Sequence, residues 1–515
     1  MRKFGDLTMS VRHSSSLPSK LRALALVDHG SRSIREIAAD LQIPKSTLHD
    51  NLPIYRRDVA RFMEWQDESD RHLVRNILIQ MFDGKTSSRA CAITLSKLMN
   101  MVISHQQVLR VLDLSAGAAL EINTSKLSLK TVSCAAFDEI FQRQQPILGF
   151  ADPFSALIYI SDTDDRSGNT WASFLTSLKR LGLDPVSTVT DGGSGLLCGI
   201  RQVFSESIPL RDLFHFLHKL SKAKRILEGK CYAMIAAEVK LCRSSAETKD
   251  LEILRIKVNE ALFLFDQLEA VVRRLNNACY FAPNESPCYV TAEALRAIVS
   301  ECIDVLGQAQ QKISDHRSIK AAITYLKSGS KSISAYKDML EKSVAEIFGP
   351  LNSSMVLQFI CPIIESLDQY HRSHDSKEKQ RFWGQKIAAL RASFRSCLWI
   401  DQDEVDRAIT MVSKLMDEVK KSNSLMESVN SVIRCHLQTY KSIPRWFCSI
   451  FTFFWNHRKF SRGKRKGMSP LEIASGKPSE GDWIDLLLAS FPFQELHLGT
   501  KSMTQAADDE KNPAA

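Results

Sequence analysis

The sequence predicts a mostly α-helical protein built around one α/β core, a five-stranded mixed sheet, with a large all-helical insertion. Three observations predict this class. Short apolar, β-prone runs concentrate between residues 128 and 221. Helical periodicity dominates the residues before them, and amphipathic helical segments fill residues 222–420, with separate helices expected at 318–325 and 334–348 among them. The composition, with 44% hydrophobic and 24% charged residues, is that of an ordinary folded protein.

The composition also narrows the class of protein. A chain of 515 residues has room for several domains. Its formal net charge of +10 permits a polyanionic partner without requiring one. The 12 cysteines form no CxxC pair, which favours reduced thiols in a cytosolic protein. The densest apolar run, residues 446–455, is about half as long as a membrane-spanning helix, so we expect no membrane association.

Residues 1–54 are predicted to form three short helices. The second covers Ile34–Leu41, and the third covers Lys45–Leu52 after a short turn. The segment 33–48 resembles the helix-turn-helix of bacterial regulators and transposases. A recognition helix begins with small polar or basic residues that reach bases and phosphates, and the third helix begins with Lys45, Ser46, Thr47 and His49. A tri-helical scaffold without DNA contact is the alternative.

Residues 55–127 are predicted to form a linking helix and a second helix-turn-helix-like module. The linking helix covers residues 55–82, and the module has helices starting at Ser88 and at Gln106 with a turn between them. Two such modules in tandem would read a longer DNA site than one. A helical spacer packed on the core is the alternative.

The core is predicted to bring two aspartates together. Strands are expected at 132–137, 146–151, 156–161, 185–191 and 208–214. Asp138 ends the first of these strands, and Asp191 ends the fourth. Because neighbouring strands of an open α/β sheet end at one edge, the two carboxylates are expected side by side. Glu139 should point away, since side chains alternate along a strand.

A helix after the insertion supplies a third acid. Glu427 and Arg434 lie on one polar stripe of that helix, opposite an apolar stripe that would pack on the sheet. Packed in this way, the helix would deliver Glu427 to the aspartates and Arg434 towards DNA. Glu365 and Glu418 are competing acids, and an exposed helical glutamate is the alternative.

The order of strands and helices, with an acid after the first and the fourth strand, resembles the ribonuclease-H-like core of DDE transposases. Residues 427–434 resemble the Glu-x-x-Asn-x-x-x-Arg-like helix of insertion-sequence transposases. Residues 212–215 resemble an Asp-x-x-His signature found near the second acid in several transposase groups. The resemblance implies a discontinuous catalytic domain, residues 128–221 and 421–475, around the insertion. Residues 476–515 would form a C-terminal segment ending in a disordered tail.

The resemblance also implies the roles of individual residues. Three acids would be catalytic and would hold two Mg²⁺ ions, with Mn²⁺ able to substitute: Asp138, Asp191 and Glu427. Three residues would support the site: Asp212, His215 and Arg434. A basic cluster would bind the phosphate backbone, with a solvated loop as the alternative: Arg458, Lys459, Arg462, Lys464, Arg465 and Lys466.

The implied function is that of a transposase of an insertion sequence. It would bind double-stranded DNA at the ends of the element, hydrolyse the 3′ ends and join them to target DNA. Handling two ends implies a homodimer or larger assembly, at the nucleoid in the cytoplasm of a prokaryote. Two other functions remain open: a transposase-derived DNA-binding regulator without catalysis, and a ribonuclease-H-like nuclease that cuts without joining.

Overall fold

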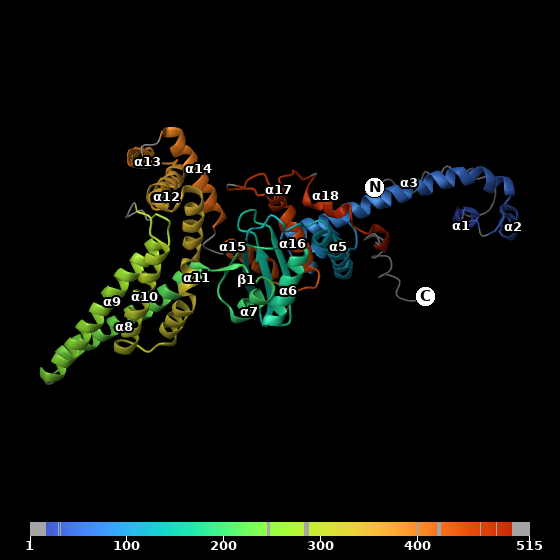
Figure 1. Ribbon diagram of the computed structural model, residues 1–515. Helices are drawn as coiled ribbons and strands as arrows, with labels where there is room; N and C mark the ends of the chain where they lie inside the picture. The colour runs from blue at the N-terminus through green and yellow to red at the C-terminus, as the bar shows by residue number, and fades with distance from the viewer. Residues whose placement is uncertain are drawn as a thin grey trace. The chain divides into compact units, whose positions relative to one another are not determined.

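The computed structural model of the chain describes residues 17–28, 30, 32–244, 248–282, 288–398, 401–419, 424–463, 465–479 and 481–496. The protein is mostly helical and contains one five-stranded mixed sheet, as predicted (Figure 1). It divides into two compact units, residues 1–114 with 484–515, and residues 115–483.

The first unit is built from helices. Its elements are α1 (Leu17–Asp28), α2 (Ile34–Asp40), α3 (Lys45–Leu78), the π-helix η1 (Ile79–Asp83), α4 (Ser88–Met99), the first half of α5 (His105–Ser125), most of α18 (Trp483–Leu488) and the 3-10 turn η2 (Phe493–Glu495). Ser33 caps α2 and forms a reciprocal capping box with Glu36. Apolar side chains of the first three helices pack together around Leu24, Ile37 and Leu48.

The helix that begins at Lys45 is longer than predicted. It passes through Pro53 and ends at Leu78, so no boundary lies at residue 54 between the predicted third helix and the linking helix. Proline lacks a backbone N–H and therefore costs the helix a hydrogen bond, but its fixed φ is close to the helical value. The residues on both sides of Pro53 hold the helical backbone, and the two predicted helices become one.

The sheet lies in the second unit. Its strands are β1 (Cys134–Gln142), β2 (Gln145–Ala151), β3 (Ile158–Asp162), β4 (Ser187–Thr190) and β5 (Ile208–Arg211). The strand order is β3-β2-β1-β4-β5, in which β1–β2 and β2–β3 are antiparallel pairs and β1–β4 and β4–β5 are parallel pairs. The five strands lie where the sequence predicts them.

The prediction that β1 ends at Asp138 is wrong, because the strand continues to Gln142. The reason is that β1 has two neighbours of different length. Its antiparallel pairing with β2 runs out to the pair Gln142–Gln145, while its parallel pairing with β4 stops at Ala136. Asp138 therefore lies inside a strand, at the point where the parallel partner has already ended.

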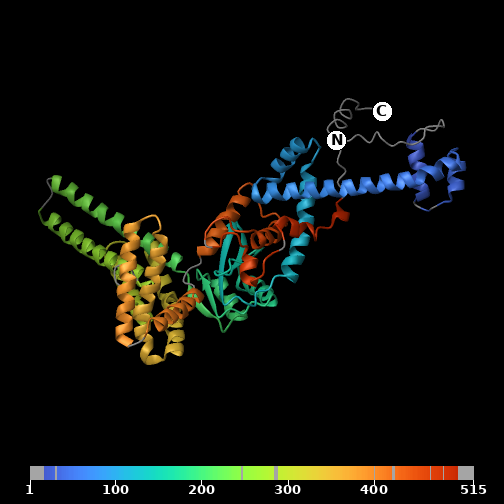
Figure 2. The same cartoon turned by 90° about the horizontal axis from the view of Figure 1, so that it is seen from above.

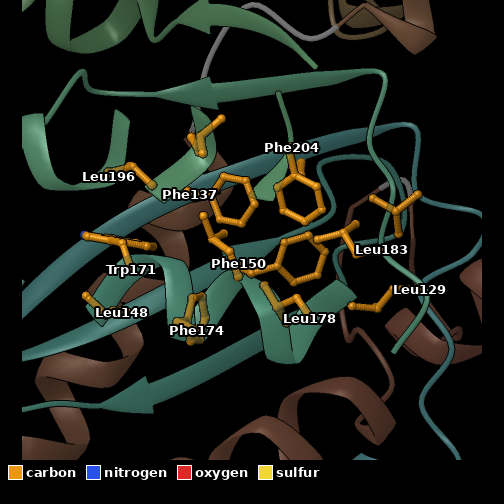
Figure 3. Close-up of a cluster of buried hydrophobic side chains, with 14 of the residues drawn as sticks. Leu129, Phe137, Leu148, Phe150, Trp171, Phe174, Leu178, Leu183, Leu196 and Phe204 are labelled. Atoms are coloured by element: carbon orange, nitrogen blue, oxygen red, sulfur yellow. The ribbon is translucent and has the colours of Figure 1, made fainter. Parts of the chain in front are cut away.

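One face of the sheet is buried under α6 (Gly168–Arg180) and α7 (Ser194–Val203), against a cluster of aromatic and aliphatic side chains (Figure 3). The ring of Trp171 meets that of Phe137 edge-on, at a centroid distance of 6.4 Å. Gly199 allows the two helices to approach closely, because a Cβ there would lie 2.8 Å from the Cβ of Trp171. This face is the apolar core that holds the strands in place.

Helices contact both edges of the sheet. On β3, the amide of Asn456 in α16 (Phe447–His457) accepts from the Ile158 N–H at 2.9 Å and donates to the Ile158 carbonyl at 2.8 Å. The hydroxyl of Thr452 accepts from the N–H of Ile160 at 3.3 Å. On the opposite edge, α11 (Arg317–Phe348) packs along β5.

The helical insertion grows directly out of the core. The remaining helices of the second unit are α8 (Leu213–Arg243), α9 (Thr248–Ala278), α10 (Ala292–Lys312), α12 (Pro350–Arg372), α13 (Lys377–Leu398), α14 (Gln402–Glu418), α15 (Ser424–Leu437) and α17 (Pro470–Ser475). Figure 2 shows α8 and α9, in green, side by side as a long hairpin. Because α8 begins at Leu213, the predicted boundary at residue 221 falls inside a helix.

The segments 318–325 and 334–348, predicted as separate helices, form one continuous helix, α11. Three serines between them donate hydrogen bonds to backbone carbonyls of the same helix, as Ser328 does to the Tyr325 carbonyl at 3.1 Å. This bonding satisfies the hydroxyls without breaking the helix. Gly329 lies at the centre of the segment and is packed against the core rather than in a loop.

Candidate metal centre

Three acids follow one another across the parallel strands of the sheet. Ala136 pairs with Val189, so counting two residues along each strand places Asp138 level with Asp191. Thr190 pairs with Arg211, so Asp212 follows β5 as Asp191 follows β4. The carboxyl ends of β4 and β5 therefore put two acids at the edge where Asp138 lies, as the sequence predicts for Asp138 and Asp191.

The helix α15 brings Glu427 to this edge from beyond the insertion. It packs on β1 and β2, with Met426 over Gly149, the residue that pairs with Asp138. A Cβ on Gly149 would lie 2.5 Å from Cε of Met426, so the missing side chain makes room for the helix. One turn along α15, the amide of Asn430 donates to Oδ2 of Asp138 at 2.9 Å.

The first turn of α8 supplies a histidine. Asp212 caps this helix, since its carboxylate accepts from the N–H of Phe214 at 2.9 Å. His215 follows, and its Nε2 lies 3.6 Å from Oε1 of Glu427. Ligand atoms of Asp138, His215 and Glu427 all lie within 4.8 Å of one another. Three elements far apart in the sequence thus meet at one point.

Burial dominates the electrostatics of Asp138, whose side chain belongs to a residue only 6% exposed. Its pKa is raised to about 7, chiefly by loss of hydration, while the hydrogen bond from the Glu139 N–H lowers this pKa. Among the smaller causes, the nearby charges of Asp191 and Glu427 raise the pKa and His215 lowers it. At neutral pH the centre is therefore short of positive charge, and a proton or a cation would relieve it.

The donor set fits a divalent cation. Two carboxylates provide hard oxygen ligands of the kind that Mg²⁺ and Mn²⁺ prefer, and one imidazole nitrogen suits Mn²⁺ better than Mg²⁺. The second amide atom of Asn430, its Oδ1, is buried without a hydrogen-bond partner among the described residues. An unsatisfied oxygen next to the Asp138 carboxylate fits a site that gains a positively charged or hydrated occupant.

Asp191 stands slightly apart from this group. Its Oδ1 accepts from the N–H of Gly193 at 2.9 Å, and its carbonyl accepts from Arg211 at 3.1 Å. Of the three acids predicted to hold metal, the described structure gathers Asp138 and Glu427 with His215, while Asp191 acts on Asp138 through its charge. The predicted support residue His215 therefore lies nearer to the centre than expected.

Three other residues discussed for the site lie outside the group formed by Asp138, His215 and Glu427. Glu139 points away from the group and forms an ion pair with Arg166, in line with the alternation along β1. Arg434 is exposed on α15. Asp212 is 1% exposed and contributes through its cap on α8.

Three residues of the predicted basic cluster make contacts within the chain. Lys459 pairs with Glu472 at 3.4 Å, Arg465 donates to the carbonyls of Pro153 and Phe154, and Arg458 lies over the ring of Phe454. Arg458, Lys459, Arg462 and Lys466 are exposed, Arg465 is half-buried, and Lys464 lies outside the described residues. At the start of α3, the exposed candidates are Lys45, Ser46 and His49, and Thr47 is half-buried.

Two residues with close contacts at the site were given no role from the sequence. Asn430 is the asparagine of the Glu-x-x-Asn pattern, and its place three positions after Glu427, on the same side of the helix, was the available signal. Arg211 is buried at the end of β5 and contacts the backbone of Asp191. Its only sequence signal was its place beside Asp212, which predicts no contact.

Comparison with known proteins adds no relative: neither a family model nor a curated protein matches the chain. Among the helices of the described ranges, none is by itself long and apolar enough to cross a membrane. Helices α11 and α12, which meet at a bend of 120°, have sufficient apolar length only when they are taken together.

Proposed function

We propose that the chain is a DDE transposase, which cleaves the ends of a mobile DNA element and joins them to target DNA. The observation that carries the proposal is the meeting of Glu427 with Asp138. Glu427 follows a long helical insertion, yet α15 returns it to a carboxylate on the central strand. The element order, three strands and then helix, strand, helix, strand and helix, supports a ribonuclease-H-like core.

The chemistry follows from the groups at the centre. Asp138 and Glu427 would hold the cation through carboxylate oxygens and His215 through a ring nitrogen. When bound, a divalent cation neutralises charge on the phosphate and makes a water molecule more acidic. Asn430 fixes the rotamer of Asp138 by its hydrogen bond, so the carboxylate is oriented before any ligand arrives.

Two phosphoryl transfers are proposed in sequence. In the first, a water oxygen attacks a phosphorus at the element's end, and the bond to the 3′ oxygen breaks to leave a 3′-hydroxyl and a 5′-phosphate. In the second, this 3′-hydroxyl attacks a phosphorus of target DNA and releases a target 3′-hydroxyl. One phosphodiester bond forms for each one broken in the second step, so it needs no external energy source.

Binding of DNA is proposed for two basic surfaces. The exposed start of α3 offers Lys45, Ser46 and His49, and the loop after α16 offers Arg462 and Lys466. The cationic side chains of Lys45, Arg462 and Lys466 would gain affinity by releasing counterions from the DNA backbone. Because two element ends must be processed together, we propose that the active form is a dimer or larger assembly.

The test uses the full chain, Mg²⁺, a supercoiled target plasmid and linear DNA carrying the two segments that flank the gene. We expect cleavage at the flanks, followed by covalent joining to the plasmid. Glu427→Gln should reduce both by more than about 100-fold, beyond the loss typical of residues that only support metal ligands. Gel-shift affinity for the flanking DNA should stay close to wild type.

Glu418→Gln is the matched control, because this exposed glutamate at the end of α14 was the nearest competing acid. It should retain cleavage and joining. DNA binding without metal-dependent cutting would favour the regulator, and cutting without joining would favour the nuclease. Wild-type rates in Glu427→Gln would contradict the proposed site.

A further inference from the structure

A buried arginine lies behind the candidate metal centre. Arg211 is the last residue of β5, pairs with Thr190 and is only 6% exposed. Its Nη1 donates to the carbonyl of Asp191 at 3.1 Å. Burying a guanidinium costs free energy, so a buried arginine normally makes specific interactions that offset this cost. Here the guanidinium binds the turn that carries Asp191.

The turn after β4 wraps around this guanidinium. Gly192 has a φ of +87°, a conformation that favours glycine, and a Cβ at this position would overlap Nη1 of Arg211. The glycine therefore meets two demands at once, the backbone conformation and the space for the arginine. Any shift of the guanidinium would be transmitted to the turn and to Asp191.

The other side of the guanidinium rests on the helical insertion. Its Cζ lies 4.6 Å from the ring centre of Tyr325 in α11, which is within the range of a cation–π interaction. Its Nη2 is 3.5 Å from the hydroxyl of Ser328. A Cβ on Gly329 would lie 2.9 Å from its Nε, so α11 approaches as closely as a glycine permits.

We propose that Arg211 is a positioning residue through which the helical insertion holds Asp191 in place beside the cation site, level with Asp138. Docking of α11 fixes the guanidinium, and the guanidinium fixes the Asp191–Gly192 turn. The insertion is then a working part of the site, which is organised only while α11 is docked. This inference rests on the proposed function for its catalytic meaning, but its geometry concerns cation affinity directly.

The test is the affinity of the full chain for Mn²⁺, measured by electron paramagnetic resonance without DNA. Gly329→Ala should push the guanidinium away from α11, and alanine should preserve the helix. We expect the Mn²⁺ dissociation constant to rise about 10-fold or more, because a displaced Asp191 carboxylate would no longer place its negative charge beside Asp138, and outer-shell groups typically contribute about this much to metal affinity. Far-ultraviolet circular dichroism and a melting curve check that the variant is folded.

Gly307→Ala is the matched control. Gly307 is also a helical glycine of the insertion, in α10, and a Cβ there meets nothing within 4 Å. It should leave Mn²⁺ affinity unchanged. A second pair, Tyr325→Leu and Tyr325→Phe, tests the contact between α11 and Arg211 without adding bulk. The leucine should weaken Mn²⁺ binding because it removes the ring, and the phenylalanine should stay near wild type.

The outcomes separate the two proposals. Wild-type Mn²⁺ affinity in folded Gly329→Ala and Tyr325→Leu would overturn the role of Arg211. Should Gly329→Ala fail to fold, the Tyr325 pair alone decides. A wild-type chain that binds Mn²⁺ but never cuts DNA would overturn the proposed transposase function. The role of Arg211 would then still be decided by the Mn²⁺ affinities of the variants. A wild-type chain that binds no Mn²⁺ would overturn both.

Discussion

Phe137 and Asp138 are neighbours on β1, yet they face opposite sides of the sheet and meet different surroundings. Phe137 is fully buried among aromatic rings under α6 and α7. Asp138 is nearly as buried, but it lies among charged and amide groups with α15 against its strand. One face contributes stability, and the other carries a carboxylate that is destabilised by its setting. The apolar face offsets the cost of the polar one.

The largest effect is expected on the apolar face. Phe137→Ala removes a ring that contacts Trp171 and Phe150, and should lower the free energy of unfolding by about 3–5 kcal/mol. Phe141→Ala on the same strand is the control, since this ring is 43% exposed and should cost less than about 1 kcal/mol. Urea unfolding curves measure both. Equal costs would show that the packing of Phe137 is not what holds this face.

The polar face should respond in the opposite direction. The folded pKa of Asp138, about 7, lies above its ordinary value of 3.8, so its protonation stabilises the fold at low pH and this contribution is lost as pH rises through 7. In chelator at pH 8, Asp138→Asn should therefore be more stable than wild type, by an amount of the order of 2–4 kcal/mol. It should bind no Mn²⁺.

Unfolding measured from pH 5 to pH 8.5 checks the sign of this prediction. The difference between Asp138→Asn and wild type should shrink towards pH 5, where Asp138 is protonated in the folded state. Asp164→Asn, a change to an exposed loop acid, should follow wild type at every pH. A gap that grows as the pH falls would contradict the assigned environment of Asp138.

A smaller effect is expected at Asn430. Replacing it by alanine leaves Oδ2 of Asp138 without its amide donor, which should cost about 2 kcal/mol at pH 8. The cost should fall when Asp138 is already asparagine, because a neutral acceptor gains less from the same donor. A double-mutant cycle from urea unfolding measures this coupling. Additive costs would mean that the hydrogen bond contributes no coupling.

The smallest effect is expected at Gly149. A Cβ there meets Cε of Met426, which is the far end of a flexible side chain, so Gly149→Ala should cost only about 1 kcal/mol. In a Met426→Ala background, the same change should add almost no cost. Thermal unfolding of the four proteins gives the answer. A large cost in both backgrounds would mean that the strand itself, rather than the approach of α15, requires glycine.

The positions of the strands, and the alignment of Asp138 with Asp191, were largely predictable from the sequence. Apolar runs mark the five strands, and the expected juxtaposition of Asp138 and Asp191 follows from the register of β1 with β4. These patterns are local, since each strand carries its own alternation and length. The continuation of β1 to Gln142 was missed because it depends on the hairpin partner β2.

Contacts between distant segments were less predictable. The packing of α15 on the sheet was expected from the apolar stripe of that helix. The short distance between His215 and Glu427 instead depends on how α8 and α15 pack. The contact of Arg211 with Gly329 depends on α11, which the sequence predicts as two separate helices because serine and glycine usually favour a loop. Local propensity carries no information about which helix covers a glycine.

The covered edges of the sheet have a consequence for self-association. Asn456 and Thr452 already occupy backbone groups of β3, and α11 lies along β5. On β3, the backbone groups of Ile158 and the amide of Ile160 are therefore not free to pair with a strand from another molecule, as β-augmentation would require. At the β3 edge, extension of the sheet by a second copy of the chain would first require these side-chain hydrogen bonds from α16 to break.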